Sequence, residues 1–190
     1  QHALSLHDNV AHSGQATLDA QYAHLFALVQ LSGLYQRSDR HKDAVPLTER
    51  AVAVTEKLLG PEHPNVASGL ESLAAMYGLL RRFADAEAPR KRALAINERA
   101  YGNEHPNVAE SLRGLGHLYR LQDRFEEALP LLQRGLSIAE KTLGADHPLL
   151  VMHLTEIAEL HRTQRRYTDA EALLRRALAN VDTSHGVAAE

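Results

Sequence analysis

The sequence contains no cysteine and no tryptophan, and aromatic residues make up only 5% of its 190 positions. Without cysteine, a disulfide framework, a thiolate zinc site and a cysteine nucleophile are all excluded. No apolar run approaches the ~20 residues that a membrane-spanning helix needs, and no signal-peptide pattern opens the chain. We therefore expect a globular protein. The cytoplasm is favoured, and periplasmic or secreted locations stay open.

An excess of positive charge is also missing. The chain has 21 Lys and Arg residues against 24 Asp and Glu residues, which gives a formal net charge of -3. A protein that binds nucleic acid through bulk positive charge normally carries a basic excess, so that class is excluded. The sequence does have length and apolar content: 44% of its residues are hydrophobic, which is enough to bury a core.

A repeat of 42 residues organises the chain. The segment GPEHPNVA begins at Gly60, GNEHPNVA at Gly102 and GADHPLLV at Gly144, each 42 residues after the one before. Self-similarity of this kind predicts a repeat architecture, in which each unit stacks on its neighbours. Other columns follow the same step: Tyr35, Tyr77, Tyr119 and His161; Ala44, Ala86, Ala128 and Ala170; Ala51, Ala93, Gly135 and Ala177; and Arg50, Arg92, Arg134 and Arg176.

Each unit contains two helical patterns. In the third unit, Leu112, Leu115 and Tyr119 lie on one face of a helix. Gly144 suits the left-handed turn after a helix, and Pro148 suits the first turn of the next one. Because one helix pair cannot bury both of its apolar sides, stacked pairs form an all-α solenoid. We expect an A helix at 23–38, 65–80, 107–122 and 149–164, and a B helix at 41–58, 83–100, 125–142 and 167–180.

Two terminal segments flank the repeats. Residues 2–12 weakly imitate the B helix of a preceding repeat, and Ser13-Gly14 is expected to end that helix. Because repeat arrays normally carry a polar cap, we expect the chain to be part of a larger protein. The expected divisions are an N-terminal segment at 1–22, repeats at 23–64, 65–106, 107–148 and 149–181, and a tail at 182–190.

The third unit carries a family resemblance. The pattern Leu112-x-x-Leu115-Gly116-x-x-Tyr119, followed by Ala128, resembles the tetratricopeptide repeat. The 42-residue period and the segment ERAVAVTEKLLGPEHPNVA are similar to the kinesin light chain subtype. Frequent alanine and scarce lysine favour a bacterial source. The resemblance implies a right-handed solenoid of antiparallel helix pairs, whose A helices line a concave groove that binds a protein or peptide.

The resemblance also supplies candidate groove residues. We expect a basic centre at Arg113, His117 and Arg120, a more neutral first unit and an acidic fourth unit. Alternatively, the equivalent positions Glu71 and Arg113 simply neutralise each other in solvent. The full candidate set is Gln30, Gln36, Arg37, Glu71, Arg113, His117, Arg120, Glu156, Glu159 and Arg162. The paired asparagines typical of kinesin light chains are absent at Val29-Gln30, Glu71-Ser72, Arg113-Gly114 and Thr155-Glu156, so we do not carry over a transport function.

Catalytic and metal-binding patterns are missing, and we expect no enzyme activity, no cofactor and no metal. The chain has no H-E-x-x-H, no phosphate-binding glycine loop and no G-x-S-x-G. His63, His105 and His147 each precede a proline, where an imidazole accepts a hydrogen bond from a free amide at a helix start. His161 replaces a column tyrosine and is expected in the core.

The predicted function is a scaffold that binds a protein or peptide in the groove. One alternative is self-association through the uncapped C-terminal face, which would make the chain a homo-oligomer. Another is a regulatory repeat segment of a larger enzyme or signalling protein. The sequence does not name the partner, because repeat scaffolds share a fold and differ in their surfaces.

Overall fold

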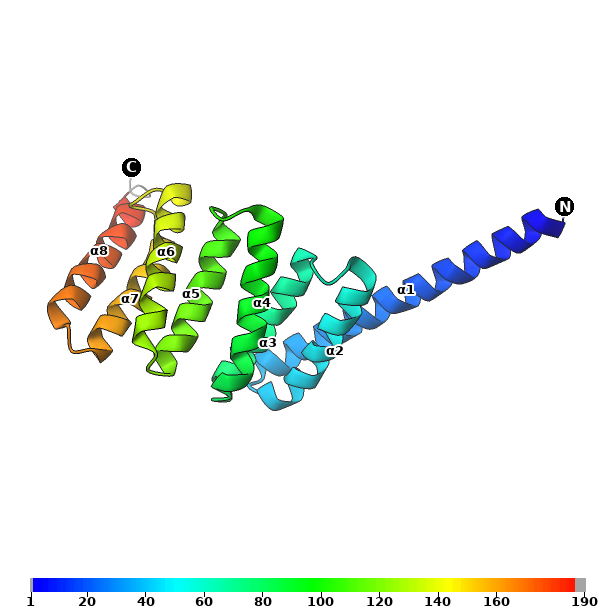
Figure 1. Cartoon of the computed structure of the whole chain (residues 1–190), viewed down its shortest axis with the longest axis horizontal. Helices are drawn as coiled ribbons and strands as arrows, with labels where there is room; N and C mark the ends of the chain where they lie inside the picture. Colours follow the sequence, from blue (N-terminus) through cyan, green and yellow to red (C-terminus); the bar gives the residue numbers. More distant parts are fainter. Residues whose placement is uncertain (1, 187–190) are drawn as a thin grey trace.

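The computed structural model describes residues 2–186, and side chains over residues 16–182. Within these residues the chain is entirely helical and has no strand. The eight helices follow one another in an elongated row, with α1 projecting at one end (Figure 1). Their bounds are α1 His2–Arg37, α2 His41–Leu59, α3 Pro64–Leu79, α4 Phe83–Tyr101, α5 Pro106–Leu121, α6 Phe125–Leu143, α7 Leu150–Thr163 and α8 Tyr167–Gly186.

The helices pack as antiparallel pairs that also contact the next pair. The closest pairings are α1 with α2, α3 with α4, α5 with α6 and α7 with α8, and each B helix also packs on the following A helix. The core therefore runs along the row rather than forming one centre. Leu112, Leu132 and Leu160 are almost completely buried in it. The all-α solenoid expected from the repeat is confirmed.

The turn within each helix pair contains one non-glycine residue in the left-handed backbone conformation. Asp123 lies in the left-handed region at φ 57°, and the Arg124 amide then donates to the Tyr119 carbonyl over 2.9 Å. The Arg124 guanidinium covers the Tyr119 ring at 3.9 Å and pairs with Glu127. This contact gives the tyrosine column its physical reason, since a cation over an aromatic face closes the turn. The equivalent left-handed residues are Asp39, Arg81, Asp123 and Arg165.

The turn between pairs depends on glycine and histidine. Gly60 has φ 93°, a conformation that glycine adopts without steric cost. The His63 Nδ1 atom then accepts a hydrogen bond from the Asn65 amide at 3.1 Å. His105 and His147 accept equivalent bonds from the amides two residues later, at 3.1 and 3.2 Å. The predicted capping role of these histidines is confirmed.

Two expected helix ends are wrong. Ser13 and Gly14 lie inside α1, so residues 2–12 continue directly into the first A helix instead of ending in a turn. Serine and glycine cost a helix only about 1 kcal/mol or less each, and no proline is present to stop it. At the other end, α8 continues to Gly186, past the expected start of the tail. Gly186 continues the 42-residue glycine spacing, a signal hidden by the polar residues before it.

Candidate protein-binding groove

Hollows open between successive repeats on the face lined by the A helices. One of about 400 Å³ lies between α1, α2 and α3, and another of about 510 Å³ lies between α3, α4 and α5. A third, of about 270 Å³, lies between α5, α6 and α7. We call the first hollow the neutral segment, because Leu25, Val29, Ser32, Gly33, Gln36, Thr48, Ala51, Thr55, Asn65, Ser68, Gly69 and Ser72 line it and none is charged.

The polar groups of the neutral segment bond mainly to one another. The Ser32 and Thr48 hydroxyls lie 2.6 Å apart, and both residues are buried. The Gln36 amide nitrogen donates to Ser32 at 3.1 Å and to Ser72 on α3 at 3.3 Å. Because these groups are already satisfied, the floor of the hollow is polar in composition but does not call for a charged ligand.

An apolar stripe on α1 borders the neutral segment. Leu18, Tyr22, Phe26 and Val29 are all exposed, and their spacing places them on one side of the helix. Val29 also lines the hollow itself. Single exposed apolar residues are ordinary, but an aligned set beside a hollow marks a candidate contact surface.

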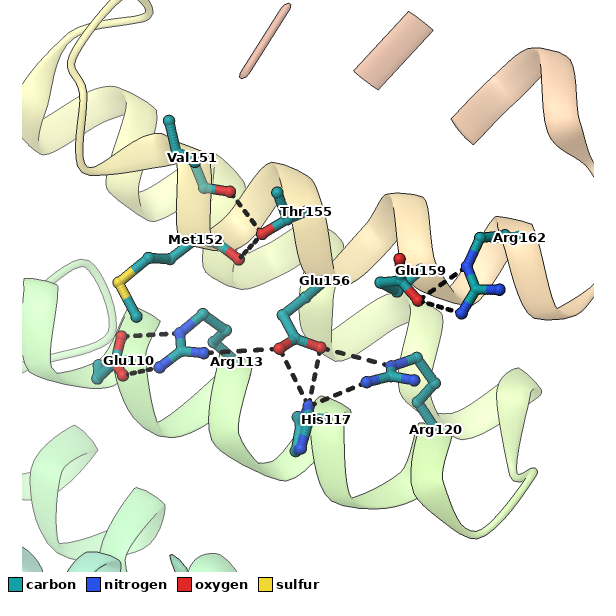
Figure 2. Close-up of polar contacts among 10 residues, drawn as sticks. All are labelled: Glu110, Arg113, His117, Arg120, Val151, Met152, Thr155, Glu156, Glu159 and Arg162. Atoms are coloured by element: carbon teal, nitrogen blue, oxygen red, sulfur yellow. Dashed lines mark hydrogen bonds and ion pairs between the residues drawn. The ribbon is translucent and has the colours of Figure 1, made fainter. Parts of the chain in front are cut away.

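The charged segment lies further along the same face, on α3, α4, α5 and α7. We define it as Glu71, Arg90, Glu110, Arg113, His117, Arg120 and Glu156. Glu156 of α7 lies among three basic side chains of α5 (Figure 2). His117 Nδ1 approaches its two carboxylate oxygens at 2.9 and 3.0 Å, Arg120 Nε lies 3.4 Å away and Arg113 Nη1 lies 3.8 Å away.

Electrostatics hold Glu156 ionised. Burial alone would raise the pKa of Glu156, but the hydrogen bond from His117 and the charges of Arg120 and Arg113 outweigh it and hold that pKa below its ordinary value. Arg113 is also clamped by Glu110, with Nε 3.0 Å from Oε2. The basic third unit and the acidic fourth unit, expected as separate bands, are therefore in contact and largely neutralise each other.

Glu71 has a different partner from the one the sequence suggested. It pairs with Arg90 of α4, a residue that the sequence analysis did not single out. A Cβ at Gly114 would collide with the Arg90 guanidinium, so glycine at that position leaves room for it. Burial raises the pKa of Glu71, although Arg90 acts in the opposite direction. Gly114 was the sequence signal that a side chain from another helix passes close to α5.

The remaining candidate residues lie apart from these two segments. Gln30 and Arg37 are exposed on α1 and do not line the neutral segment. Glu159 and Arg162 pair with each other at 2.7 Å further along α7 (Figure 2). Of the expected set, Gln36 belongs to the neutral segment, and Glu71, Arg113, His117, Arg120 and Glu156 belong to the charged segment.

Two further histidines, His153 and His161, are buried among the helices. His161 is buried, as expected of a core substitution, and burial together with Arg166 lowers its pKa. Burial also lowers the pKa of His153. Over residues whose side chains the structure describes, no three His, Asp or Glu side chains gather closely enough to hold a metal ion. None of the described helices combines the length and apolarity needed to cross a bilayer.

The sequence matches a known protein family. The tetratricopeptide repeat model matches residues 24–96, 70–141 and 115–182, which together span most of the chain. The chain belongs to the tetratricopeptide repeat family. Tetratricopeptide repeats generally mediate protein–protein interaction, and proteins built from them are generally scaffolds without catalysis. No curated protein shows significant similarity to the sequence.

Several solved structures share the fold. BtubC (BKLC) from P. vanneervenii superposes with a TM-score of 0.77 at 24% identity, over 85% of this chain and 65% of that one. A putative kinesin light chain from Podosopora anserina, with nearly identical TPR-like repeats, gives 0.70 at 27% identity, over 84% and 76%. MamA gives 0.61 at 16% identity, over 90% and 86%. This tetratricopeptide repeat chain therefore spans about two thirds of the length of BtubC, and its structural neighbours include a putative kinesin light chain.

Proposed function

We propose that this chain binds a protein segment along the face of its A helices, with apolar ligand side chains seated in the neutral segment. The observation that supports this most strongly is the hollow of about 400 Å³ with no charged residue in its lining. The apolar stripe beside it, at Phe26 and Val29, extends the surface that a ligand would cover. Apolar anchors in pockets usually supply most of the affinity of such contacts.

The charged segment has a lesser role in this proposal. Arg113 and Arg120 already face Glu156, so a ligand carboxylate would have to compete with an ion pair that the protein makes itself. Exchange of one ion pair for another yields little net free energy. Contacts of the ligand with Arg113, His117 and Arg120 would therefore set its orientation, whereas the neutral segment would set its affinity.

The ligand that suits both segments is an amphipathic peptide segment. A helix laid in a groove presents apolar residues at i, i+3, i+4 and i+7, and the stripe on α1 offers apolar partners at a matching helical spacing. Charged residues on the rest of the ligand would lie towards α5 and α7. Gln36, whose amide bridges α1 and α3, is the polar residue best placed beside such a ligand.

A peptide library displayed on phage tests the proposal, with the 190-residue chain as bait. We expect the selected peptides to carry apolar residues at helical spacing, and Val29→Lys to weaken their binding about tenfold or more. Tyr167→Lys, at an exposed residue on α8, is the control for an added lysine and should bind as the unchanged chain does. Peptides that lose binding in Arg113→Glu but not in Val29→Lys would contradict the proposal.

A further inference from the structure

The two ends of the helical row expose apolar side chains whose columns are buried or partly buried in the other repeats. Leu34 on α1 is 54% exposed, whereas Met76, Leu118 and Leu160, at the same position in the later repeats, are at most 3% exposed. Leu31 is likewise exposed, although Leu73, Leu115 and Ile157 in its column are buried. In the interior repeats these side chains pack against neighbouring helices in one continuous core. The α1 face therefore carries the apolar side chains that would pack against a preceding repeat.

The α8 face is the complement of the α1 face. Leu174 is 42% exposed, whereas Leu132 in the same column is 1% exposed. Leu178 is also exposed and occupies the same repeat position as Val52. A Cβ at Gly69 of α3 would collide with the Val52 side chain, so this column points at the next A helix along the row. Helix α8 has 20 residues against 19 in α6, and thus presents a full-length B helix.

An ion pair between successive B helices recurs with the same repeat. Arg134 on α6 pairs with Glu98 on α4 at 2.7 Å, and Arg176 on α8 pairs with Glu140 on α6 at 2.6 Å. Arg92 on α4 pairs in the same way with Glu56 on α2. Each pair joins a B helix to the B helix before it, and each lies 42 residues after the previous one. The ion pairs are therefore a regular connection between repeats.

The two ends of this series are left open. Arg50 is the first arginine of the column and contacts His24, with no carboxylate partner among residues 16–182. Asp182 follows Glu140 by 42 residues and is exposed, and it too has no ion-pair partner among those residues. One end of the row thus offers the basic half of the repeating pair, and the other end offers the acidic half.

We propose that a second copy of this chain docks its α8 face onto the α1–α2 face of the first, so that the solenoid continues across two chains. Leu174 and Leu178 of one copy pack against Leu31 and Leu34 of the other. Asp182 then lies opposite Arg50, as Glu140 lies opposite Arg176 within the chain. Because the two faces differ, the contact does not close after two copies and produces an open row.

This contact is independent of the peptide groove. Leu31 lies two residues after Val29, which places the two side chains about 160° apart around α1. A second copy on Leu31 and Leu34 therefore leaves the neutral segment accessible. Failure of one proposal does not affect the other, since Val29→Lys changes only the groove and Leu34→Lys changes only the end face.

Two variants that each block one end give the sharpest test. Sedimentation velocity of the full chain should show a mass that rises with concentration beyond the dimer, between about 5 and about 500 µM. Leu34→Lys blocks the α1 face and Leu178→Lys blocks the α8 face, so each variant alone should stay monomeric. An equimolar mixture should form a dimer that grows no further, because each variant retains the face that the other lacks.

Charge exchange tests the register of the contact. Arg50→Asp and Asp182→Arg should each weaken association about tenfold, and the double variant should recover it. Ala179→Lys, at an α8 position whose column is exposed in every repeat, is the matched control and should associate normally, and circular dichroism should show unchanged helicity throughout. An unchanged chain that stays monomeric at every concentration, or blocked variants that fail to combine, would overturn the proposal and leave both faces to a different protein.

Discussion

The neutral segment and the charged segment occupy equivalent places on successive repeats and both border a hollow, yet neutral side chains line one hollow and ion-paired side chains line the other. Thr48 and Ser72 in the first become Arg90 and Gly114 one repeat later, at the same spacing. The short hydroxyls leave the first hollow without charge, whereas Arg90 pairs with Glu71 in the lining of the second. The same backbone therefore gives two surfaces, and the charge of a few column residues decides whether the hollow between repeats is neutral or ion-paired.

The two segments also differ in what holds them together. Hydroxyl and amide groups in the neutral segment form neutral hydrogen bonds, which contribute about 1 kcal/mol each. The charged segment depends on partly buried ion pairs, and removal of one partner leaves the others uncompensated. Substitutions at equivalent columns should therefore have unequal costs, and this inequality can be measured.

Glu156→Ala should have the largest effect. Without this carboxylate, Arg113, His117 and Arg120 lose their shared partner in a partly buried position. We expect the free energy of unfolding to fall by about 2 kcal/mol. Ser72→Ala changes the same column two repeats earlier and should cost about 1 kcal/mol or less. Urea titrations of both variants check this order, and equal costs would remove the distinction between the segments.

Gly114→Ala should have the next largest effect. The added methyl group collides with the Arg90 guanidinium and pushes it away from Glu71, at a cost of about 1 kcal/mol. In an Arg90→Ala background the same glycine change should cost almost nothing, because the obstacle is gone. A double-mutant cycle measures this coupling, and strictly additive costs would show that Arg90 does not determine the residue at position 114.

The smallest effect concerns acid stability. The folded-state pKa of Glu156 lies below its ordinary value of 4.5, so Glu156 stabilises the fold fully above that pH. The stabilisation is lost as the pH falls through the lower, folded-state pKa. Glu156→Gln should therefore lose less stability between pH 5 and 3 than the unchanged chain. Thermal unfolding across that window checks the prediction, and parallel pH profiles would count against an ionised, paired Glu156.

Most of the fold was predictable because the repeat is recorded in the sequence. The Gly-x-x-His-Pro turns fixed where the A helices begin, and the structure places the histidine caps where the sequence predicted them. The expected helix end at Ser13-Gly14 failed because serine and glycine weaken a helix without stopping it. The 42-residue glycine spacing predicts the end of α8 at Gly186, but the polar residues before Gly186 favour an earlier end.

The candidate site was less predictable, for a physical reason. Helical spacing gives the direction of a side chain on its own helix, but not the reach of a side chain from a neighbouring one. Arg90 comes from a B helix, and Glu156 reaches across from α7 to α5, so neither pairing follows from the column positions alone. Neutral residues such as Ser32 and Thr48 carry no charge or motif that marks them in the sequence, although they line the neutral segment.

The most direct test of the neutral segment as the binding surface is a map of backbone amide shifts by nuclear magnetic resonance, recorded as a selected peptide is added to the chain. We expect the largest shifts on α1 and α3, around Val29, Gly33 and Ser72, and smaller shifts on α5. Shifts concentrated around Arg113, His117 and Glu156, with α1 unaffected, would contradict the central claim that the neutral segment is the binding surface.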